Sequence, residues 1–339
     1  MRARVLGGLS AVSWLIVAAA CANSPSGPPP TLTCPAPIQI VSPDNNPVVV
    51  TFTAPATAGT PSVTSTCTPA SGSLFAVGTT AVRCSAPVSG PPISCSFNVT
   101  VTAPPQLEKT RTLAFGDSIT FGAEALCNGL TAQRWTPAEL LRSWEGMAAV
   151  AAPYPSVLER MLKERYSAQS PTVFNAGLAG ESVNDSETRR RFTRTLNERN
   201  PEIVLLQEGI NDLHVFDLFG IPPSQGIRGV VDSLRAMSLE ARGRGIQVFL
   251  GTLLPERPNG CRAFAIPPRN DVDLITPTND QIRAMAAAER IDLIDLHAVF
   301  AGQTASLLGQ DGLHPSDAGY AAIANAFFEA IKQKFEKPR

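Results

Sequence analysis

From about residue 108 onward, short apolar runs alternate with longer amphipathic stretches. The runs have the length and composition of strands buried on both faces of a sheet: residues 112–115, 172–175, 202–206, 246–250 and 291–294. The stretches between or after them have the spacing of helices: roughly 154–167, 185–199, 226–244, 278–289 and 317–334. This rhythm predicts an α/β fold over residues 108–335, with helices packed on a doubly wound sheet of five parallel strands.

Residues 34–103 follow a different pattern, in which no helical period appears. Short β-type runs, such as 38–41 and 95–101, are separated by turns of proline, glycine and serine. Between residues 34 and 102 only Asp44 and Arg83 are charged. This pattern predicts a small β-sandwich, joined to the α/β region by a linker at Ala103-Pro104-Pro105.

The first 33 residues are predicted to be targeting and tether segments. Arg2 and Arg4 precede an apolar run, 5–20, that is short for a membrane span and ends in small residues before Cys21. Residues 1–21 resemble a bacterial lipoprotein signal, which implies a lipid anchor at Cys21 and attachment to a membrane of the cell envelope. Ordinary signal cleavage nearby is the alternative, and both predict export. Residues 22–33 indicate a flexible or polyproline-like tether.

Cysteine usage is consistent with an oxidising compartment. Seven cysteines are present, so an even number, six, remains once Cys21 is set aside. Four of these lie in the first 100 residues, which suggests two bridges in the small domain. Cys127 and Cys261 would form the third bridge, and the alternative that both are free stays open.

Overall composition is that of a globular protein, with 44% hydrophobic and 17% charged residues. The net charge of −1 gives no global field that would favour nucleic acid, so no nucleic-acid partner is expected. The densest basic cluster consists of Arg189, Arg190, Arg191 and Arg194. Because acidic residues flank this cluster, it is predicted to be the solvated face of a helix.

The candidate chemistry centres on the segment Gly116-Asp117-Ser118-Ile119-Thr120. It directly follows the strand at 112–115, so Ser118 is predicted at the carboxyl edge of the sheet, where open α/β folds bind ligands. A serine hydroxyl is a weak nucleophile and needs an adjacent base. His314 lies three residues after Asp311, so a single turn there would let Asp311 fix the imidazole while its other nitrogen faces Ser118.

A tetrahedral intermediate also needs hydrogen-bond donors for its oxyanion. The backbone N–H of Ser118, the side-chain amide of Asn211 and a glycine N–H in the segment 177–180 are the candidates. Each fragment also has a plain interpretation as a turn. All three follow the ends of predicted strands, however, so one fold would bring them together.

The set Gly116-Asp117-Ser118, Gly177 with Gly180, Gly209-Ile210-Asn211-Asp212 and Asp311-Gly312-Leu313-His314 resembles the SGNH (GDSL-type) hydrolases. All four signature blocks of that family occur in order across residues 110–335. The resemblance implies a flavodoxin-like three-layer α/β/α fold and ester hydrolysis without a metal or organic cofactor. It makes Ser118 the nucleophile, His314 the base and Asp311 its partner, and it assigns Gly180 and Asn211 to the oxyanion hole with Ser118.

The segment from Gly72 to Phe97 resembles a hyalin-repeat (HYR) module. That resemblance covers about 70 residues of the β region and implies an immunoglobulin-like sandwich that serves as a spacer or adhesion module. The expected disulfide pairings in this module are Cys67–Cys84 and Cys34–Cys95.

Two regions depart from the family pattern or lie beside the expected site. The stretch between Thr120 and Tyr154 is longer than in the family, and its Trp135 and Trp144 are candidates for an apolar substrate rim, with an extra helical excursion as the equal alternative. His214, just after Asn211-Asp212, is a candidate substrate contact or a loop histidine bonded to backbone.

Taken together, the sequence predicts an exported serine esterase that acts on short acyl esters or acetylated carbohydrate through an acyl-enzyme. The alternatives are a lysophospholipase- or lipase-like enzyme, an acyltransferase that uses the same serine, and a catalytically inactive surface protein for adhesion or carbohydrate binding.

Overall fold

The computed structural model describes residues 30–59, 62–88, 90–125, 127, 148–216, 221–257, 260 and 273–337. The chain divides into two compact units, an N-terminal β module up to Thr102 and a C-terminal α/β domain from Ala103, and the short segment Val41–Asn46 is grouped with the second unit. The expected signal segment with Cys21 lies outside the described residues. Thr31–Leu32, which the sequence pattern assigned to the tether, forms strand β1.

The β module is the small sandwich that the sequence predicts. Its largest sheet has the order β2-β8-β7-β5, formed by Ile38–Val41, Ile93–Thr102, Gly78–Ala86 and Thr66–Thr68. Two short strand pairs complete it: β3 (Val48–Val50) with β6 (Ser73–Phe75), and β1 with β4 (Thr57–Ala58). The inward-facing residues build a small core that includes Phe75, Val82, Phe97, Val99 and Val101.

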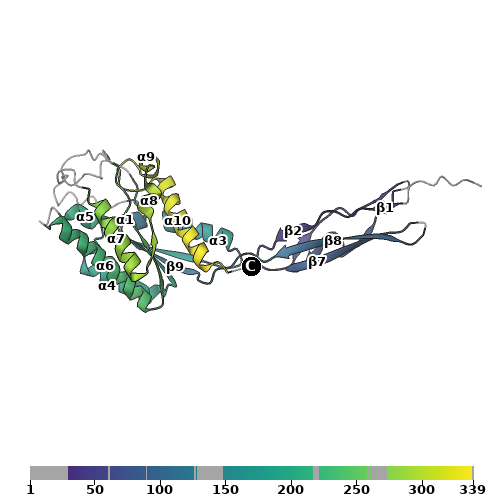
Figure 1. Cartoon of the computed structure of the whole chain (residues 1–339), viewed down its shortest axis with the longest axis horizontal. Coiled ribbons are helices and arrows are strands. Elements are labelled where there is room, and N and C mark those ends of the chain that lie inside the picture. The colour runs from purple at the N-terminus through teal and green to yellow at the C-terminus, as the bar shows by residue number, and fades with distance from the viewer. Residues whose placement is uncertain are drawn as a thin grey trace, which may run out of the picture. The chain divides into compact units, whose positions relative to one another are not determined.

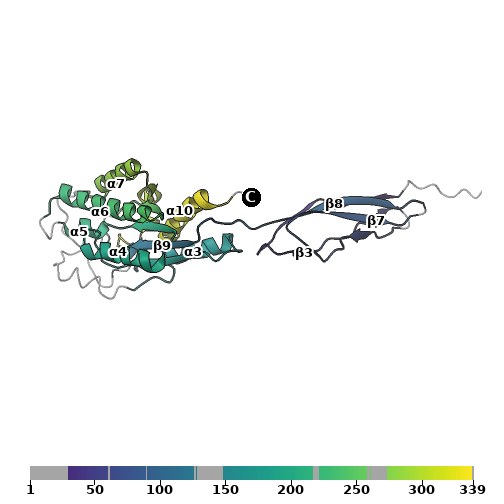
Figure 2. The same ribbon diagram turned by 90° about the horizontal axis from the view of Figure 1, so that it is seen from below.

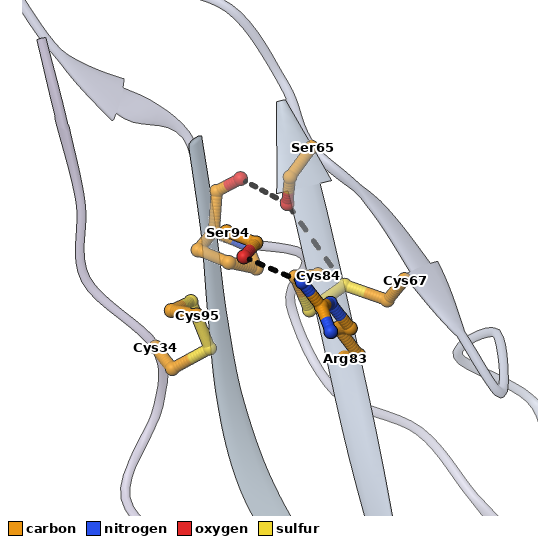
Figure 3. The surroundings of a disulfide bond; sticks show 8 residues. Cys34, Ser65, Cys67, Arg83, Cys84, Ser94 and Cys95 are labelled. Carbon is orange, nitrogen blue, oxygen red and sulfur yellow. Dashed lines mark hydrogen bonds between the residues drawn. A yellow bond between two sulfur atoms is a disulfide. The ribbon is translucent and has the colours of Figure 1, made fainter. Parts of the chain in front are cut away.

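Two disulfides cross-link this module: one joins the neighbouring strands β5 and β7, and the other joins the segment after β1 to β8 (Figure 3). Cys67 of β5 lies opposite Cys84 of β7 and is bonded to it. Cys84 is in turn opposite Cys95 of β8, which is bonded to Cys34. Both pairings agree with the expectation that came with the HYR resemblance. Because so small a module buries little apolar surface, cross-links are a natural source of its stability.

The C-terminal domain contains one five-stranded sheet in which all paired strands are parallel. Its order is β10-β9-β11-β12-β13, formed by Thr172–Gly177, Arg111–Gly116, Ile203–Gln207, Gln247–Gly251 and Asp292–Ile294. This is the 2-1-3-4-5 order of flavodoxin-like folds. Each strand begins within one residue of its predicted position, and the predicted fold class is confirmed.

Helices flank this sheet on both sides (Figures 1 and 2). The five long helices match the predicted amphipathic stretches to within about three residues: α3 (Tyr154–Arg165), α4 (Ser186–Arg199), α6 (Pro223–Gly243), α7 (Ile275–Glu289) and α10 (Asp317–Phe335). Short helices α1 (Ser118–Phe121), α5 (Ile210–Val215), α8 (Leu296–Phe300) and α9 (Thr304–Leu307) lie between them. Within the described part of the chain, none of the helices has the length and apolarity needed to cross a membrane.

Aromatic pairs join the helices to the sheet and to one another. Phe115 of β9 packs edge-on against Phe192 of α4, with ring centroids 5.0 Å apart. Tyr154 of α3 stacks on Phe327 of α10 at 5.6 Å. Burial of such large apolar side chains supplies most of the driving force for folding, so the scaffold beneath the sheet edge is rigid.

Candidate active site

Three adjacent strands, β10, β9 and β11, end side by side, which fixes where the chemistry can occur. Gly116, the last residue of β9, is in register with Gly177 at the end of β10 and with Gln207 at the end of β11. The segments that follow these residues contain Ser118, Gly180 and Asn211. The fold therefore brings the predicted nucleophile and the predicted oxyanion donors to one edge of the sheet.

The turn that carries Ser118 is tightly constrained. A Cβ atom on Gly116 would lie 2.1 Å from Thr120 Oγ1 and 2.2 Å from the Gln207 carbonyl oxygen, so only glycine fits there. Asp117 caps α1, because its Oδ1 accepts the Ile119 N–H at 2.9 Å. Ser118 consequently opens the helix, and its side chain is held at a buried position with 3% exposure.

The C-terminal loop completes the predicted hydrogen-bonded set. Asp311 Oδ1 accepts the backbone N–H groups of Leu313 and His314 at 3.0 and 2.9 Å, which closes the turn that the Asp-x-x-His spacing suggested. Asp311 Oδ2 lies 2.5 Å from His314 Nδ1, and His314 Nε2 lies 2.8 Å from Ser118 Oγ. Gly312 supports this tight turn with a left-handed φ of +77°.

The electrostatics of this chain of hydrogen bonds suit a general base. Burial alone would raise the pKa of Asp311, but the hydrogen bond and charge of His314, together with the two backbone N–H groups, outweigh it and hold the pKa below its ordinary value. Asp311 is therefore a carboxylate at neutral pH and keeps a proton on His314 Nδ1. The unprotonated Nε2 then faces the hydroxyl of Ser118.

The two glycines of the second block have different structural roles. A Cβ on Gly177 would lie 2.0 Å from the Phe121 nitrogen, so this glycine lets β10 pack against α1. Gly180 has a φ of +77°, and its N–H has no acceptor among the described residues. Gly180 is thus the member of the pair whose backbone donor remains available at the site.

Asn211 lies in the first turn of α5 and is 3% exposed. Its Nδ2 donates to the Glu181 carbonyl oxygen at 2.8 Å. A side-chain amide carries two N–H donors, so one remains for an oxyanion after this bond has fixed the orientation of the side chain.

The loop 309–314 is supported by a residue that sequence reasoning missed. Arg257, from the segment after β12, donates its backbone N–H to the Gly312 carbonyl at 2.8 Å and its guanidinium to the Gly309 carbonyl. On the other side, a Cβ on Gly309 would lie 2.0 Å from that of Ala125. No motif in the sequence marks Arg257, because its partners are backbone oxygens far away along the chain.

His214 contacts a carboxylate side chain. Its Nε2 is hydrogen-bonded to Glu256, which sequence reasoning also missed. Burial lowers the pKa of His214, but the charge and hydrogen bond of Glu256 raise it more, so the net pKa lies above its ordinary value. His214 and Asn211 are one turn apart on α5, which places this ion pair beside the candidate oxyanion hole.

Other predicted positions lie outside the described residues or differ from expectation. Trp135 and Trp144 are not among the described residues. Cys127 is disulfide-bonded, and its expected partner Cys261 falls outside the described part of the chain.

The prediction that the whole arginine cluster is a solvated helix face is wrong at one position. Arg189, Arg190 and Arg194 are exposed, whereas the guanidinium of Arg191 turns inward. It donates to both carboxylate oxygens of Glu181 and to the Ala176 carbonyl at 2.8 Å. It also lies 3.9 Å from the ring centroid of Phe115. Position 191 lies on the face of α4 that is turned toward the sheet. Its contact with the buried carboxylate of Glu181 distinguishes Arg191 from the three exposed arginines.

At the carboxyl edge of this flavodoxin-like sheet, a carboxylate, an imidazole and a serine hydroxyl are linked by consecutive hydrogen bonds. This arrangement is that of a serine ester hydrolase. Residues 114–322, more than half of the chain, match the model of the GDSL-like lipase/acylhydrolase family, and the protein belongs to this family. Residues 27–101 match the HYR domain. No curated protein matches the sequence.

Solved structures show the same fold at low sequence identity. A putative GDSL-like lipase from Parabacteroides merdae is 20% identical and superposes with a TM-score of 0.50, covering 67% of this chain and 97% of its own. A lipase/acylhydrolase from Enterococcus faecalis is 22% identical, with a TM-score of 0.48 and coverages of 67% and 97%. An acetylxylan esterase from Geobacillus stearothermophilus, in a catalytic mutant, is 21% identical, with a TM-score of 0.47 and coverages of 66% and 94%.

Proposed function

We propose that this protein hydrolyses short acyl esters, including acetyl esters of carbohydrates, through an acyl-enzyme formed on Ser118. The observation that carries the proposal is the unbroken chain of hydrogen bonds from Asp311 through His314 to Ser118, with spacings of 2.5 and 2.8 Å. These are the contacts that a general base needs with a nucleophile and with the group that orients the base.

The reaction follows from these contacts. Ser118 Oγ attacks the ester carbonyl while its proton passes to His314 Nε2, and the carbonyl oxygen becomes an oxyanion. The backbone N–H groups of Ser118 and Gly180 and the free N–H of Asn211 donate to that oxygen. His314 then gives its proton to the departing alcohol, which leaves the acyl group on Ser118. In the second half, His314 takes a proton from water, the resulting hydroxide attacks the acyl carbon, and Ser118 recovers its proton.

Preference for a short acyl group is supported by the burial of the site. Ser118 is 3% exposed and His314 is 1% exposed, so a substrate must reach the hydroxyl through a small opening. An acetyl group needs little room, whereas an octanoyl chain needs an apolar channel of its own.

A panel of esters tests this function. p-Nitrophenyl acetate, butyrate and octanoate and acetylated xylan would be compared with wild type and with Ser118→Ala. We expect acetate to be cleaved fastest and Ser118→Ala to lose hydrolysis by about 10⁴-fold or more. His297→Ala is the matched control with full activity expected. Equal rates for wild type and Ser118→Ala would refute the mechanism, and much faster turnover of octanoate would refute the preference.

Water is the proposed acceptor of the acyl group, and product analysis in the presence of an added alcohol or sugar tests that choice. Free acid is the expected product. A dominant transfer product would instead indicate an acyltransferase built on the same residues.

We also propose that the protein is exported and anchored through a lipid on Cys21, because small residues lead directly to this cysteine after a short apolar run. Labelling of cells with a fatty-acid analogue would mark wild type and leave Cys21→Ser unmarked. Equal release of both forms in soluble form would exclude the anchor.

A further inference from the structure

Four buried carboxyl groups converge behind the candidate active site. Asp117 and Glu208 follow Gly116 and Gln207, which are register partners on adjacent parallel strands, so the two acids leave the sheet side by side. The other two are neighbours of the expected oxyanion donors. Glu181 follows Gly180 and Asp212 follows Asn211, and none of the four acids is more than 9% exposed.

Glu208 is, with Asp117, one of the two acids of this cluster that have one oxygen without a donor among the described residues. It is fully buried, and its Oε2 accepts the N–H of Gly209 at 2.9 Å. Its Oε1 has no donor among the described residues. The group within hydrogen-bonding reach of the Glu208 side chain is the carboxyl of Glu181. Two carboxylates are both acceptors, so only a proton can join them.

The surrounding charges indicate which acid holds that proton. Glu181 is paired with the guanidinium of Arg191, which stabilises its ionised form. Asp212 accepts from the Ser182 hydroxyl and two backbone N–H groups, which offset part of the effect of burial on its pKa. Within the described part of the chain, Glu208 has neither a cation nor such a set of donors.

The other groups near Glu208 also favour its protonated form. Burial, followed by the charges of Asp117, Glu181 and Asp212, raises the pKa of Glu208 well above its ordinary value. Burial also raises the pKa of Asp117 to about 7. Among the described residues, the cationic groups beside the cluster are Arg191, which is paired with Glu181, and His214 when it is protonated, which is paired with Glu256. A fourth buried negative charge would therefore be unpaired.

The backbone of Glu181 connects this cluster to the oxyanion hole. Its carbonyl oxygen accepts the Asn211 Nδ2 at 2.8 Å, and its peptide nitrogen is bonded directly to Gly180. Any bond that fixes Glu181 therefore fixes the positions of both predicted oxyanion donors. Arg191 donates to both oxygens of its carboxylate, and Glu208 lies within hydrogen-bonding reach of the same group.

We propose that Glu208 is a positioning residue that remains protonated at neutral pH and donates its proton to Glu181, so that Gly180 and Asn211 stay aligned for the oxyanion. This inference rests on the proposed function of the Ser118 site. Loss of the proton at alkaline pH removes the Glu208–Glu181 bond and adds a negative charge beside a hole that must accept one. The activity should consequently fall on the alkaline side.

The test compares the pH dependence of kcat for wild type, Glu208→Gln and Glu208→Leu, with Ser118→Ala as the blank for spontaneous hydrolysis. The Gln side chain can still donate to Glu181 but cannot ionise. We expect Glu208→Gln to keep kcat within about threefold at pH 7 and to lose the alkaline decline, which should reach about tenfold in wild type. Glu208→Leu should lower kcat about tenfold at every pH with little change in KM.

Glu329→Gln, on the exposed face of α10, is the matched control and should reproduce the wild-type profile. An alkaline decline in Glu208→Gln equal to that of wild type would overturn the proposal. Activity of Ser118→Ala equal to that of wild type would instead overturn the proposed function, so the two failures are distinguishable.

A second measurement does not depend on activity. The infrared spectrum of the full-length protein near neutral pH should contain the C=O stretch of a buried protonated carboxyl, which disappears on alkaline titration and is weakened or missing in Glu208→Gln. An unchanged band in that variant would place the proton on a different acid and would refute the assignment to Glu208.

Discussion

The two units of this chain obtain their stability in different ways. The β module has a small core, two charged residues between positions 34 and 102, and two disulfides. The α/β domain has a large aromatic and aliphatic core, and among its described residues it also buries ionisable side chains at the carboxyl edge of its sheet.

This difference distinguishes a unit that only has to be stable from a unit that also carries the candidate active site. Burying a charged or polar group costs free energy unless it is paired, so a fold that only has to be stable has little reason to keep such groups inside. The β module pairs Ser65 with a backbone carbonyl and otherwise buries little polarity. In the α/β domain, Asp117, Glu208, Asp311 and His314 are all nearly inaccessible to solvent and lie at one edge. The function should therefore be sensitive to changes at that edge and insensitive to changes in the module.

The strongest test of this contrast is Asp311→Asn. The amide keeps the shape of the side chain but holds the imidazole in the wrong tautomer, so we expect kcat for p-nitrophenyl acetate to fall by about 10⁴-fold. The unfolding transition of the β module should not move. Asp280→Asn, at an exposed position on α7, is the control and should retain full activity. A loss of less than tenfold in Asp311→Asn would mean that the pairing with His314 is not used in the reaction.

Removal of the Cys34–Cys95 disulfide, whose cysteines are 61 positions apart, should instead affect the stability of the β module and leave the activity unchanged. Loop-closure entropy predicts that Cys34→Ser with Cys95→Ser lowers the free energy of unfolding of the module by about 4 kcal/mol. We expect kcat and KM to stay the same, because the catalytic residues belong to the other unit. Thermal unfolding of the full chain and an ester assay measure the two effects, with Ser94→Ala as a near-neutral control. A matching loss of activity would show that the units depend on each other.

Much of the fold could be predicted from the sequence because its signals are local. A buried parallel strand is an apolar run and a surface helix has a periodic apolar face, so the pattern of apolar positions alone predicts β9 and α10. The turn at Asp311–His314 is equally predictable, because its spacing alone brings the two side chains to one side.

The parts of the site that were missed depend on contacts between distant segments. Arg257 binds backbone oxygens about 50 positions away, and Arg191 is distinguished from its neighbours only by the acid that faces it. Glu208 precedes a recognisable motif, but its place beside Asp117 follows from the pairing of Gln207 with Gly116 on adjacent strands. No periodicity in the sequence encodes such pairings.

A smaller effect on activity is expected for Asn211→Ala. Removal of one oxyanion donor raises the barrier by about 3 kcal/mol, which lowers kcat by about 10²-fold with little change in KM. Asn197→Ala, whose side chain bonds Arg244 at the surface, is the matched control. A rise in KM with unchanged kcat would instead assign Asn211 to ground-state binding of the substrate.

The last change is read out in stability instead of activity, and Glu208→Gln should be stabilising at neutral and alkaline pH. In the unfolded chain Glu208 ionises near its ordinary pKa of 4.5, whereas the folded protein raises that pKa, so its folded state binds more protons above this pH. Stability in wild type therefore falls as pH rises from about 4.5 toward the raised pKa, by about 1.4 kcal/mol for each unit. Glutamine cannot ionise and removes this loss. We expect a gain of about 3 kcal/mol or more at pH 8 that vanishes near pH 4, measured by denaturant unfolding of the α/β domain in the full chain. A gain that did not depend on pH would contradict this account, because only ionisation of Glu208 makes it grow as pH rises.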